Sequence, residues 1–411
     1  MTDSRRGLRP RSLWREPQLW QGAWILSLTW MGISILLGFD IFAHAPHDSY
    51  TLMALAWRKG LLHLEQNYTW LELAIYNGNY YVSFPSVPAL VMLPLTFLFG
   101  ENTPNTVVTG LYFLGSYLAA YHLCRRFRRP ADALFMALFM TMGCNMLQFS
   151  LTGDVWNQAQ LLSFFLTTAC ATGLTGRTPA EWGAGLLCLA LSVGCRPFQA
   201  VYVPFGLWML YQNLSKAKPA PLKRTLPRML PYLIAPALVA VALGWYNWVR
   251  FGNPIEFGHN YLPEFTRDPT QPQLSLKYIG QNIRNLLRLP YFENGRLEFP
   301  LFNGFAFYLA NPIYVTAIAC VALKAARRSW DWGDTLLCAG FAAEIFLLLM
   351  HRTFGGWQFG ARYLCDLAPM LLLFELRGRR RREGWETAIG SFAIAFNIYG
   401  AIVFHLIDQG K

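Results

Sequence analysis

Long apolar stretches alternate with short polar segments along the whole chain. A helix needs about 20 apolar residues to cross the hydrocarbon core of a bilayer, and these stretches approach or reach that length. The pattern predicts an all-α polytopic membrane protein in which residues 1–411 form one integral membrane domain. We expect about eleven membrane-spanning helices, at residues 20–42, 106–124, 131–149, 158–174, 182–195, 198–214, 229–249, 302–323, 335–350, 362–376 and 388–407.

The apolar stretch at residues 87–100 is the one that decides the topology, because it is short and contains two prolines. If it crossed the membrane, every later loop would change sides. Basic residues favour the cytoplasmic side. We therefore expect this stretch to lie in the interface or to re-enter, which leaves the basic segments in the cytoplasm. These segments are the N-terminal cluster Arg5, Arg6, Arg9, Arg11 and Arg15, and residues 125–129, 216–228, 324–328 and 377–382.

This topology places the long polar loops and the candidate site residues on the external side of the membrane. The first external loop covers residues 43–105 and the large external loop covers residues 250–300. In the first loop, Asp48 is placed to cap an interfacial helix at residues 49–62. Further along, Asn77-Gly78 separates two strand-like runs, a pattern that predicts a small hairpin.

The composition supports a membrane protein and excludes several other classes. Hydrophobic residues make up 54% of the chain and charged residues 14%, whereas a soluble domain carries about 25% charged residues. The net charge of +12 arises from clusters in short loops, so we expect no nucleic-acid partner. The eight cysteines form no CxxC pair, so we expect neither a disulfide framework nor a zinc site. We expect no cleavable signal peptide, because the first apolar stretch is too long for one.

Asp48 bears most directly on function, because it follows the first predicted span closely. A carboxylate at the membrane boundary stays ionised while apolar neighbours exclude water, which suits a catalytic base acting on a lipid-linked substrate. Capping of the interfacial helix is the alternative role, and the two roles are compatible. The cytoplasmic loops contain no nucleotide-binding motif, so we expect the donor substrate to be carried by the membrane.

Several short motifs, taken in order, resemble those of the C-type membrane glycosyltransferases. The resemblance is to members that use polyprenyl-phosphate sugars, namely the aminoarabinose transferases of lipid A and the protein O-mannosyltransferases. It touches residues 40–376 in separate islands. The motifs are Asp48-Ser49-Tyr50, Asn77-Gly78-Asn79-Tyr80-Tyr81, Phe84-Pro85-Ser86-Val87-Pro88, Trp248-Val249-Arg250-Phe251-Gly252-Asn253-Pro254 and Gly356-Trp357-Gln358-Phe359-Gly360-Ala361-Arg362-Tyr363-Leu364.

The resemblance implies an inverting transfer of a hexose or pentose from a polyprenyl-phosphate donor, with no required cofactor. The acceptor is a lipid, a glycan or a protein on the external face. The resemblance also implies that Asp48 is the base and that Asp154, an acid in the second external loop, positions acceptor or sugar hydroxyls. Arg362 is the expected contact for the lipid phosphate. The remaining predicted substrate-binding residues are Arg196, Arg250, Tyr50, Tyr81 and His259.

Each of these assignments has a structural alternative. Asp154 is alternatively an ordinary loop residue, and Arg362 alternatively pairs with another buried group. Arg250 at a helix end alternatively snorkels to the interface. A divalent metal at His44, His47 and Asp48 is a weak alternative. The family commonly has a second acid directly after the first, and this chain has Ser49 there.

Two other functions compete with transfer. A polytopic lipid or sugar transporter or flippase also carries charges in its membrane domain, but it more often shows inverted repeats, and the sequence shows none. A non-catalytic scaffold does not account for the long aromatic external loops. The resemblance places the protein in the cytoplasmic (inner) membrane of a bacterium with its N-terminus in the cytoplasm, and an endoplasmic-reticulum location would use the same topology.

Overall fold

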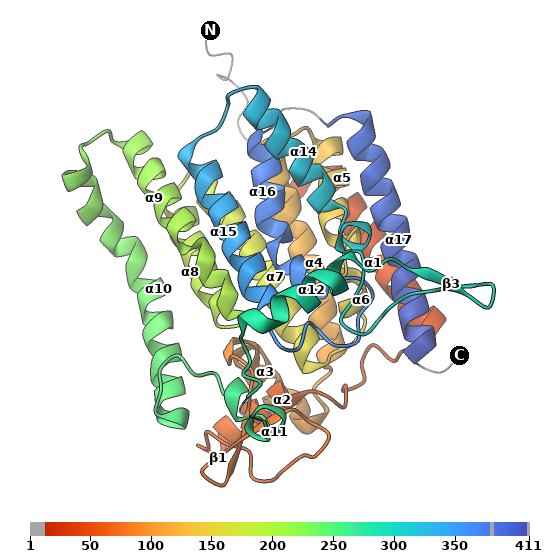
Figure 1. The fold of residues 1–411 in the computed structure, drawn as a ribbon. Coiled ribbons are helices and arrows are strands. Elements are labelled where there is room, and N and C mark those ends of the chain that lie inside the picture. The colour runs from red at the N-terminus through yellow and green to blue at the C-terminus, as the bar shows by residue number, and fades with distance from the viewer. Residues whose placement is uncertain (1–12, 269, 379–381, 409–411) are drawn as a thin grey trace.

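The computed structural model describes residues 13–268, 270–378 and 382–408, and it shows a bundle of helices with two small hairpins (Figure 1). Four of the predicted N-terminal arginines and Arg379 to Arg381 lie outside the described residues. The principal helices are α1 (Pro17–Leu37), α4 (Asn105–Arg125), α5 (Pro130–Met142), α7 (Val155–Leu174), α8 (Pro179–Val193), α9 (Val203–Ala217), α10 (Leu222–Phe251), α14 (Ile313–Ala326), α15 (Trp332–Leu349), α16 (Ala368–Gly378) and α17 (Gly384–Asp408).

Five of the described helices are long and apolar enough to cross a membrane by themselves, and they are α1, α4, α10, α15 and α17. These helices agree with a helical membrane protein. Each of the eleven predicted ranges contains at least one helix. Some of these helices are short, however: α5, α8 and α14 have 13, 15 and 14 residues. The number of membrane crossings therefore stays a prediction.

One end of the bundle, called here the loop end, carries the segments 38–104, 252–312 and 350–361. Its first segment contains α2 (Ser49–Arg58), the hairpin of β1 (Leu73–Tyr76) with β2 (Asn79–Val82), and α3 (Val87–Phe99). Asn77 and Gly78 both adopt positive φ, as the hairpin turn requires. The capped helix and the hairpin predicted from the sequence are thus present. The α3 helix has 13 residues, or about 20 Å, which is shorter than the bilayer core.

The large loop after α10 is more ordered than its sequence suggested. It contains the short helices η4 (His259–Tyr261), α11 (Pro263–Thr266), η5 (Leu276–Tyr278) and α12 (Ile279–Leu287). A second hairpin, β3 (Tyr291–Glu293) with β4 (Arg296–Glu298), turns at Asn294-Gly295. The sequence analysis did not predict this hairpin, although Asn-Gly marks its turn as it marks the first one.

Several helices are broken near the loop end. A turn separates α5 from α6 (Met146–Phe149), another separates α13 (Phe307–Ala310) from α14, and η6 (Arg362–Leu367) precedes α16. The predicted span at residues 302–323 is wrong at its start, because α14 begins only at Ile313. Asn303 and Gly304 adopt positive φ, and Pro312 lies at the helix N-cap, so the chain cannot continue as one helix there.

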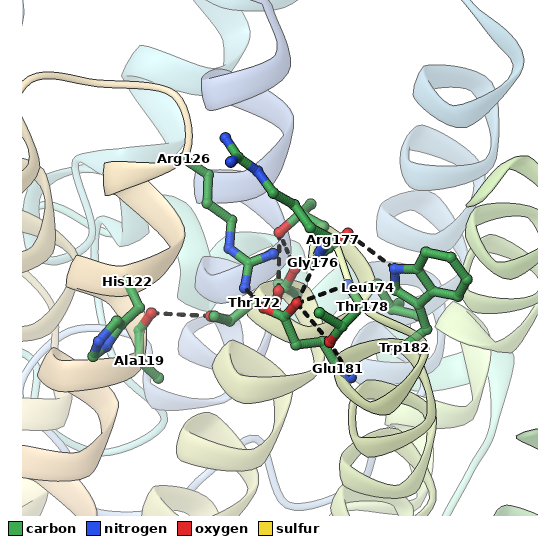
Figure 2. Close-up of polar contacts among 12 residues, drawn as sticks. Ala119, His122, Arg126, Thr172, Leu174, Gly176, Arg177, Thr178, Glu181 and Trp182 are labelled. Atoms are coloured by element: carbon green, nitrogen blue, oxygen red, sulfur yellow. Dashed lines mark hydrogen bonds and ion pairs between the residues drawn. The ribbon is translucent and has the colours of Figure 1, made fainter. Parts of the chain in front are cut away.

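The opposite end of the bundle, called here the basic end, contains the end of α4 and the start of α8. Polar contacts connect the helices there (Figure 2). The side chain of Thr178 accepts from the backbone N of Glu181 at 3.3 Å, and the Glu181 carboxylate accepts from the backbone N of Thr178 at 2.9 Å, which caps α8. Arg126, which follows α4, donates to the same carboxylate. Thr172 in α7 donates to the Ala119 carbonyl at 2.9 Å. These contacts fix α4, α7 and α8 relative to one another.

Candidate functional site

A cavity of about 250 Å³ lies at the loop end, where segments from several distant parts of the chain meet. Its lining includes apolar side chains such as Phe84, Phe198 and Leu348. It also includes polar side chains, which are Gln160, Arg196, Glu256, His259, His351 and Arg362. A largely apolar lining with a few convergent polar groups is the usual form of a ligand site.

Arg362 opens η6 and is 9% exposed. Its guanidinium packs over the rings of Phe149 and Tyr363, at 5.4 and 5.2 Å from the ring centroids. Its Nε is buried without a hydrogen-bond partner, and among the described residues no carboxylate lies within ion-pair distance of it. Asp366 and Glu72 interact with its charge only from beyond ion-pair distance. A buried cation without a direct ion pair is costly, so the position is suited to an anionic ligand.

Arg196 follows α8 and faces the same cavity. Its Nε donates to Asp366 Oδ2 at 2.8 Å, and its guanidinium lies 4.6 Å above the Tyr363 ring. Asp366 is buried, and its other oxygen accepts from Gln160 Nε2 at 3.0 Å. The same Gln160 nitrogen donates to the Arg362 carbonyl at 2.6 Å. Gln160 and Asp366 therefore connect the two arginines.

The segment before Arg362 is fixed by two fully buried asparagines, Asn145 and Asn311. Asn311 Nδ2 donates to Asn145 Oδ1 at 2.9 Å, and Asn145 Nδ2 donates to the carbonyl of Phe359. The carbonyl of Ala361 accepts from Asn311 Nδ2 at 3.3 Å. Gly360 has φ of 89°, and a Cβ there would overlap Ala310. This close packing sets the position at which the chain delivers Arg362.

Two histidines lie against each other in the cavity, with ring centroids 5.9 Å apart. His351 Nδ1 lies 2.9 Å from the Thr353 carbonyl, which only accepts, so this nitrogen carries the proton. His351 Nε2 then accepts from the Gln273 amide at 3.2 Å. Burial is the main cause that lowers the pKa of His351 to about 3 and the pKa of His259 to about 4. Repulsion from His259 and Arg196 contributes to the shift of His351, and repulsion from Arg196 contributes to that of His259. Both rings are therefore neutral near pH 7, and the two arginines supply the positive charge.

Asp48 is buried and acts as the N-cap of α2. Its Oδ1 accepts from the backbone N of Tyr50 at 2.8 Å and from Gln158 Nε2 at 2.9 Å, and its Oδ2 accepts from the Thr51 hydroxyl. Among the described residues that line the cavity, Asp48 is not found. The capping role is thus present. A base that acts beside the arginines would have to share their cavity, and Asp48 does not line the cavity that Arg196 and Arg362 line.

Asp154 is connected to a residue of the cavity lining through a small polar cluster. Its side chain is 20% exposed, and its Oδ1 lies 3.6 Å from His47 Nδ1. The His47 ring lies 5.8 Å from the ring of Trp156, which lines the cavity. Trp156 Nε1 donates to Glu72 Oε2 at 3.2 Å. Desolvation raises the pKa of Glu72, and repulsion from Glu264 adds to it. The sequence analysis missed Glu72, which lies in the strand-like run before Asn77.

Three predicted substrate-binding residues lie outside the cavity lining formed by the described part of the chain. Arg250 is 3% exposed and does not reach the surface as a snorkelling side chain would. It donates to the Val82 carbonyl at 3.3 Å and to Asn247 Oδ1 at 2.9 Å, which joins the first hairpin to the end of α10. Tyr81 packs edge-on against Phe251, and Tyr50 is fully buried.

The two weak metal candidates face different acids. His44 Nδ1 lies 3.1 Å from the Thr103 carbonyl and 4.0 Å from Asp48, whereas His47 is directed to Asp154. Within the described ranges, no group of three or more His, Cys, Asp or Glu side chains has metal-binding geometry.

Comparison with known proteins relates the chain to solved structures only. No family model matches the sequence, and no curated protein sequence matches it. The Archaeoglobus fulgidus oligosaccharyltransferase is 12% identical with a TM-score of 0.55, and the match covers 98% of this chain and 57% of that protein. The oligosaccharyltransferase AglB from the same organism, in complex with an inhibitory peptide and a dolichol-phosphate, has a TM-score of 0.56 at 12% identity, over 97% of this chain and 56% of that one.

A second solved enzyme has a similar fold at similarly low sequence identity. ArnT from Cupriavidus metallidurans bound to undecaprenyl phosphate has a TM-score of 0.50 at 12% identity, over 91% of this chain and 62% of that one. This chain thus spans a little over half the length of the solved proteins that it matches. At this identity the likeness concerns the fold, and the chain has the fold of the C-type membrane glycosyltransferases.

Proposed function

We propose that the protein transfers a sugar or glycan from a polyprenyl-phosphate carrier to an acceptor at the external face of the membrane. The observation that carries this proposal is the buried guanidinium of Arg362, whose Nε has no hydrogen-bond partner, beside Arg196 in a cavity lined by both apolar and polar side chains. Such a cavity complements a phosphate attached to an isoprenoid chain. The solved structures named above contain a dolichol-phosphate and an undecaprenyl phosphate, which are ligands of this class.

The proposed orientation follows from charge. The basic end carries the arginine-rich turns after α4 and α14, and such segments stay in the cytoplasm. The loop end with its cavity then faces the exterior, which is the periplasm in a bacterial inner membrane. The first external loop at 43–105 and the large external loop at 250–300 both contribute to the cavity.

In the proposed reaction, a hydroxyl or amine of the acceptor attacks the anomeric carbon of the donor. The bond from that carbon to the phosphate oxygen breaks, and its electron pair leaves with the lipid phosphate, so the anomeric configuration inverts. Arg362 and Arg196 stabilise the charge on the departing phosphate. The acceptor proton passes to a carboxylate. We retain Asp48 as the proposed base, with Asp154 positioning acceptor or sugar hydroxyls.

The proposal is tested by binding and turnover in lipid nanodiscs. Arg362→Ala should weaken the binding of undecaprenyl phosphate by about 10- to 100-fold, because a charge-assisted contact is worth about 1.5–3 kcal/mol. Arg126→Gln, at the basic end, is the matched control and should bind normally. Equal binding by both variants would refute the phosphate site.

Turnover separates a transferase from a flippase. The purified protein should release polyprenyl phosphate from a polyprenyl-phosphate sugar only when an acceptor is supplied. Tight binding without such release would contradict the transferase and favour transport of the lipid-linked sugar.

A further inference from the structure

The α12 helix exposes large apolar side chains and buries polar ones. Its buried side contains Asn282, Asn285 and Leu286, whereas Ile283 and Leu287, one helical turn apart, are 41% and 53% exposed. Asn282 Nδ2 donates to the carbonyls of Leu349 and His351, each at 2.9 Å. Asn282 thus caps the end of α15, and the side chains of Ile283 and Leu287 are turned away from the protein.

The hairpin that follows α12 also has one apolar face. Phe292 and Leu297 are direct cross-strand partners, so their side chains share a face, and they are 79% and 43% exposed. The next pair, Glu293 and Arg296, lies on the opposite face. Among the described strands, no third strand joins this sheet. An isolated two-stranded hairpin is only marginally stable in water, so its exposed apolar face calls for a further partner.

The position of this segment identifies the partner. The α12 helix caps α15, one of the helices of membrane-spanning length. Phe299, directly after the hairpin, lies 6.3 Å from Phe396 and 6.0 Å from Tyr399 in α17, another such helix. The hairpin projects past α17 at the side of the bundle (Figure 1). Its apolar face therefore continues the lipid-facing surface of the spanning helices.

The charges of the segment fit the surface of a membrane. Residues 276–298 contain four basic side chains and two acidic ones, which are Lys277, Arg284, Arg288, Arg296, Glu293 and Glu298. Lys277 and Arg284 are exposed, whereas Arg288 donates to the carbonyls of Phe302 and Gly304 and so joins the end of α12 to the chain beyond the hairpin. An apolar face flanked by basic residues is typical of elements that lie in the interface of an anionic bilayer.

We propose that α12 and the β3–β4 hairpin form a membrane-docking element that lies in the lipid leaflet at the loop end. Ile283, Leu287, Phe292 and Leu297 enter the boundary between head groups and acyl chains, and Lys277 and Arg284 contact anionic head groups. The element thereby anchors the large loop, which also contributes Glu256 and His259 to the cavity. This proposal does not depend on the reaction proposed above.

The test places an environment-sensitive fluorophore on Phe292→Cys in nanodiscs of matched ordinary and brominated lipid. Bromine quenches only a probe within the bilayer, so the emission at this position should fall by about half or more in brominated lipid. The matched control is Asn79→Cys in the β1–β2 hairpin, whose emission should stay nearly unchanged. The unsubstituted protein corrects for labelling of native cysteines, six of which are buried.

Two further results decide the outcome. The quenching at Phe292→Cys should grow when anionic lipid is added, and Lys277→Gln with Arg284→Gln should remove that increase. Absence of quenching at Phe292→Cys overturns the proposal. A probe that is shielded but unquenched, in nanodiscs containing two copies of the chain, would overturn it in favour of a protein–protein interface. Turnover measured on the same variants keeps this outcome separate from that of the transferase proposal.

Discussion

Arg362 and Asp48 are both buried, but they differ in how many hydrogen bonds compensate their charges. The Asp48 carboxylate accepts hydrogen bonds from backbone groups, a hydroxyl and an amide, so the protein compensates its charge. The Arg362 guanidinium packs on two rings and has a buried Nε without a partner. Burying a charge without a direct ion pair is costly, so Arg362 is the position at which we propose that an anionic ligand binds.

The two roles of Asp48 are separated by substitution with asparagine. Asn keeps a side-chain oxygen and is as good an N-cap as Asp, but it cannot take up a proton at neutral pH. If Asp48 is the base, Asp48→Asn should lower turnover by about 100-fold or more with little change in thermal stability. Asp48→Ala should lose turnover and also about 1 kcal/mol of folding stability, because the cap is removed. Turnover and thermal unfolding in detergent measure both effects.

Asp154→Asn provides the comparison for that experiment, since Asp154 is the partly exposed acid next to His47. Near-normal turnover of Asp48→Asn together with loss of turnover in Asp154→Asn would move the base to Asp154 and leave Asp48 as a cap. The order of the motifs along the sequence predicted that Asp48 and Asp154 are site residues. It did not indicate that hydrogen bonds from Tyr50, Thr51 and Gln158 would enclose one of them.

At the scale of elements, local signals in the sequence were the ones that predicted structure. An Asn-Gly turn between strand-like runs and a capping Asp before an apolar run each specified their element within about ten residues. The contacts that position the site act over much longer separations. Gln160 reaches Asp366, and Asn145 reaches Asn311, across 206 and 166 positions. These polar residues lie in or beside apolar stretches of the sequence. The hydropathy pattern therefore predicted membrane-spanning helices at these positions, but it could not predict which residues the polar side chains would contact.

The Asn145–Asn311 pair should control how firmly Arg362 is held. Asn311→Leu removes the donor to the Ala361 carbonyl and the hydrogen bond to Asn145, and it leaves buried polar groups unpaired. Each such group costs about 1–3 kcal/mol, so the variant should unfold at a lower temperature. Binding of undecaprenyl phosphate should weaken as well. Asn213→Ala, which removes a half-buried contact to the Leu174 carbonyl, is the control and should affect stability alone. Unchanged binding in Asn311→Leu would show that Arg362 is positioned by other contacts.

At the scale of the whole molecule, the two ends use charge differently. At the basic end, acidic and basic side chains pair directly, as in Glu16 with Arg125 and Asp334 with Lys324. At the loop end, Lys59 pairs with Glu65 and Arg196 pairs with Asp366, whereas Arg362 has no carboxylate within ion-pair distance among the described residues. The loop end also buries two neutral histidines beside these arginines. Protonation of either histidine would therefore add positive charge beside the arginines of the cavity.

Acid should destabilise the protein through these histidines. The pKa values of His259 and His351 fall from 6.5 in the unfolded chain to about 4 and about 3 in the folded protein. Between those values and 6.5 the unfolded chain binds protons that the folded protein does not, so the stabilisation is complete above pH 6.5 and decreases as the pH falls. The melting temperature should therefore drop between pH 7 and pH 4.5. His351→Gln keeps an acceptor toward Gln273 and removes one of the two protons, so it should reduce the contribution of the pair by about half. An identical pH profile for His351→Gln would mean that the acid sensitivity arises elsewhere.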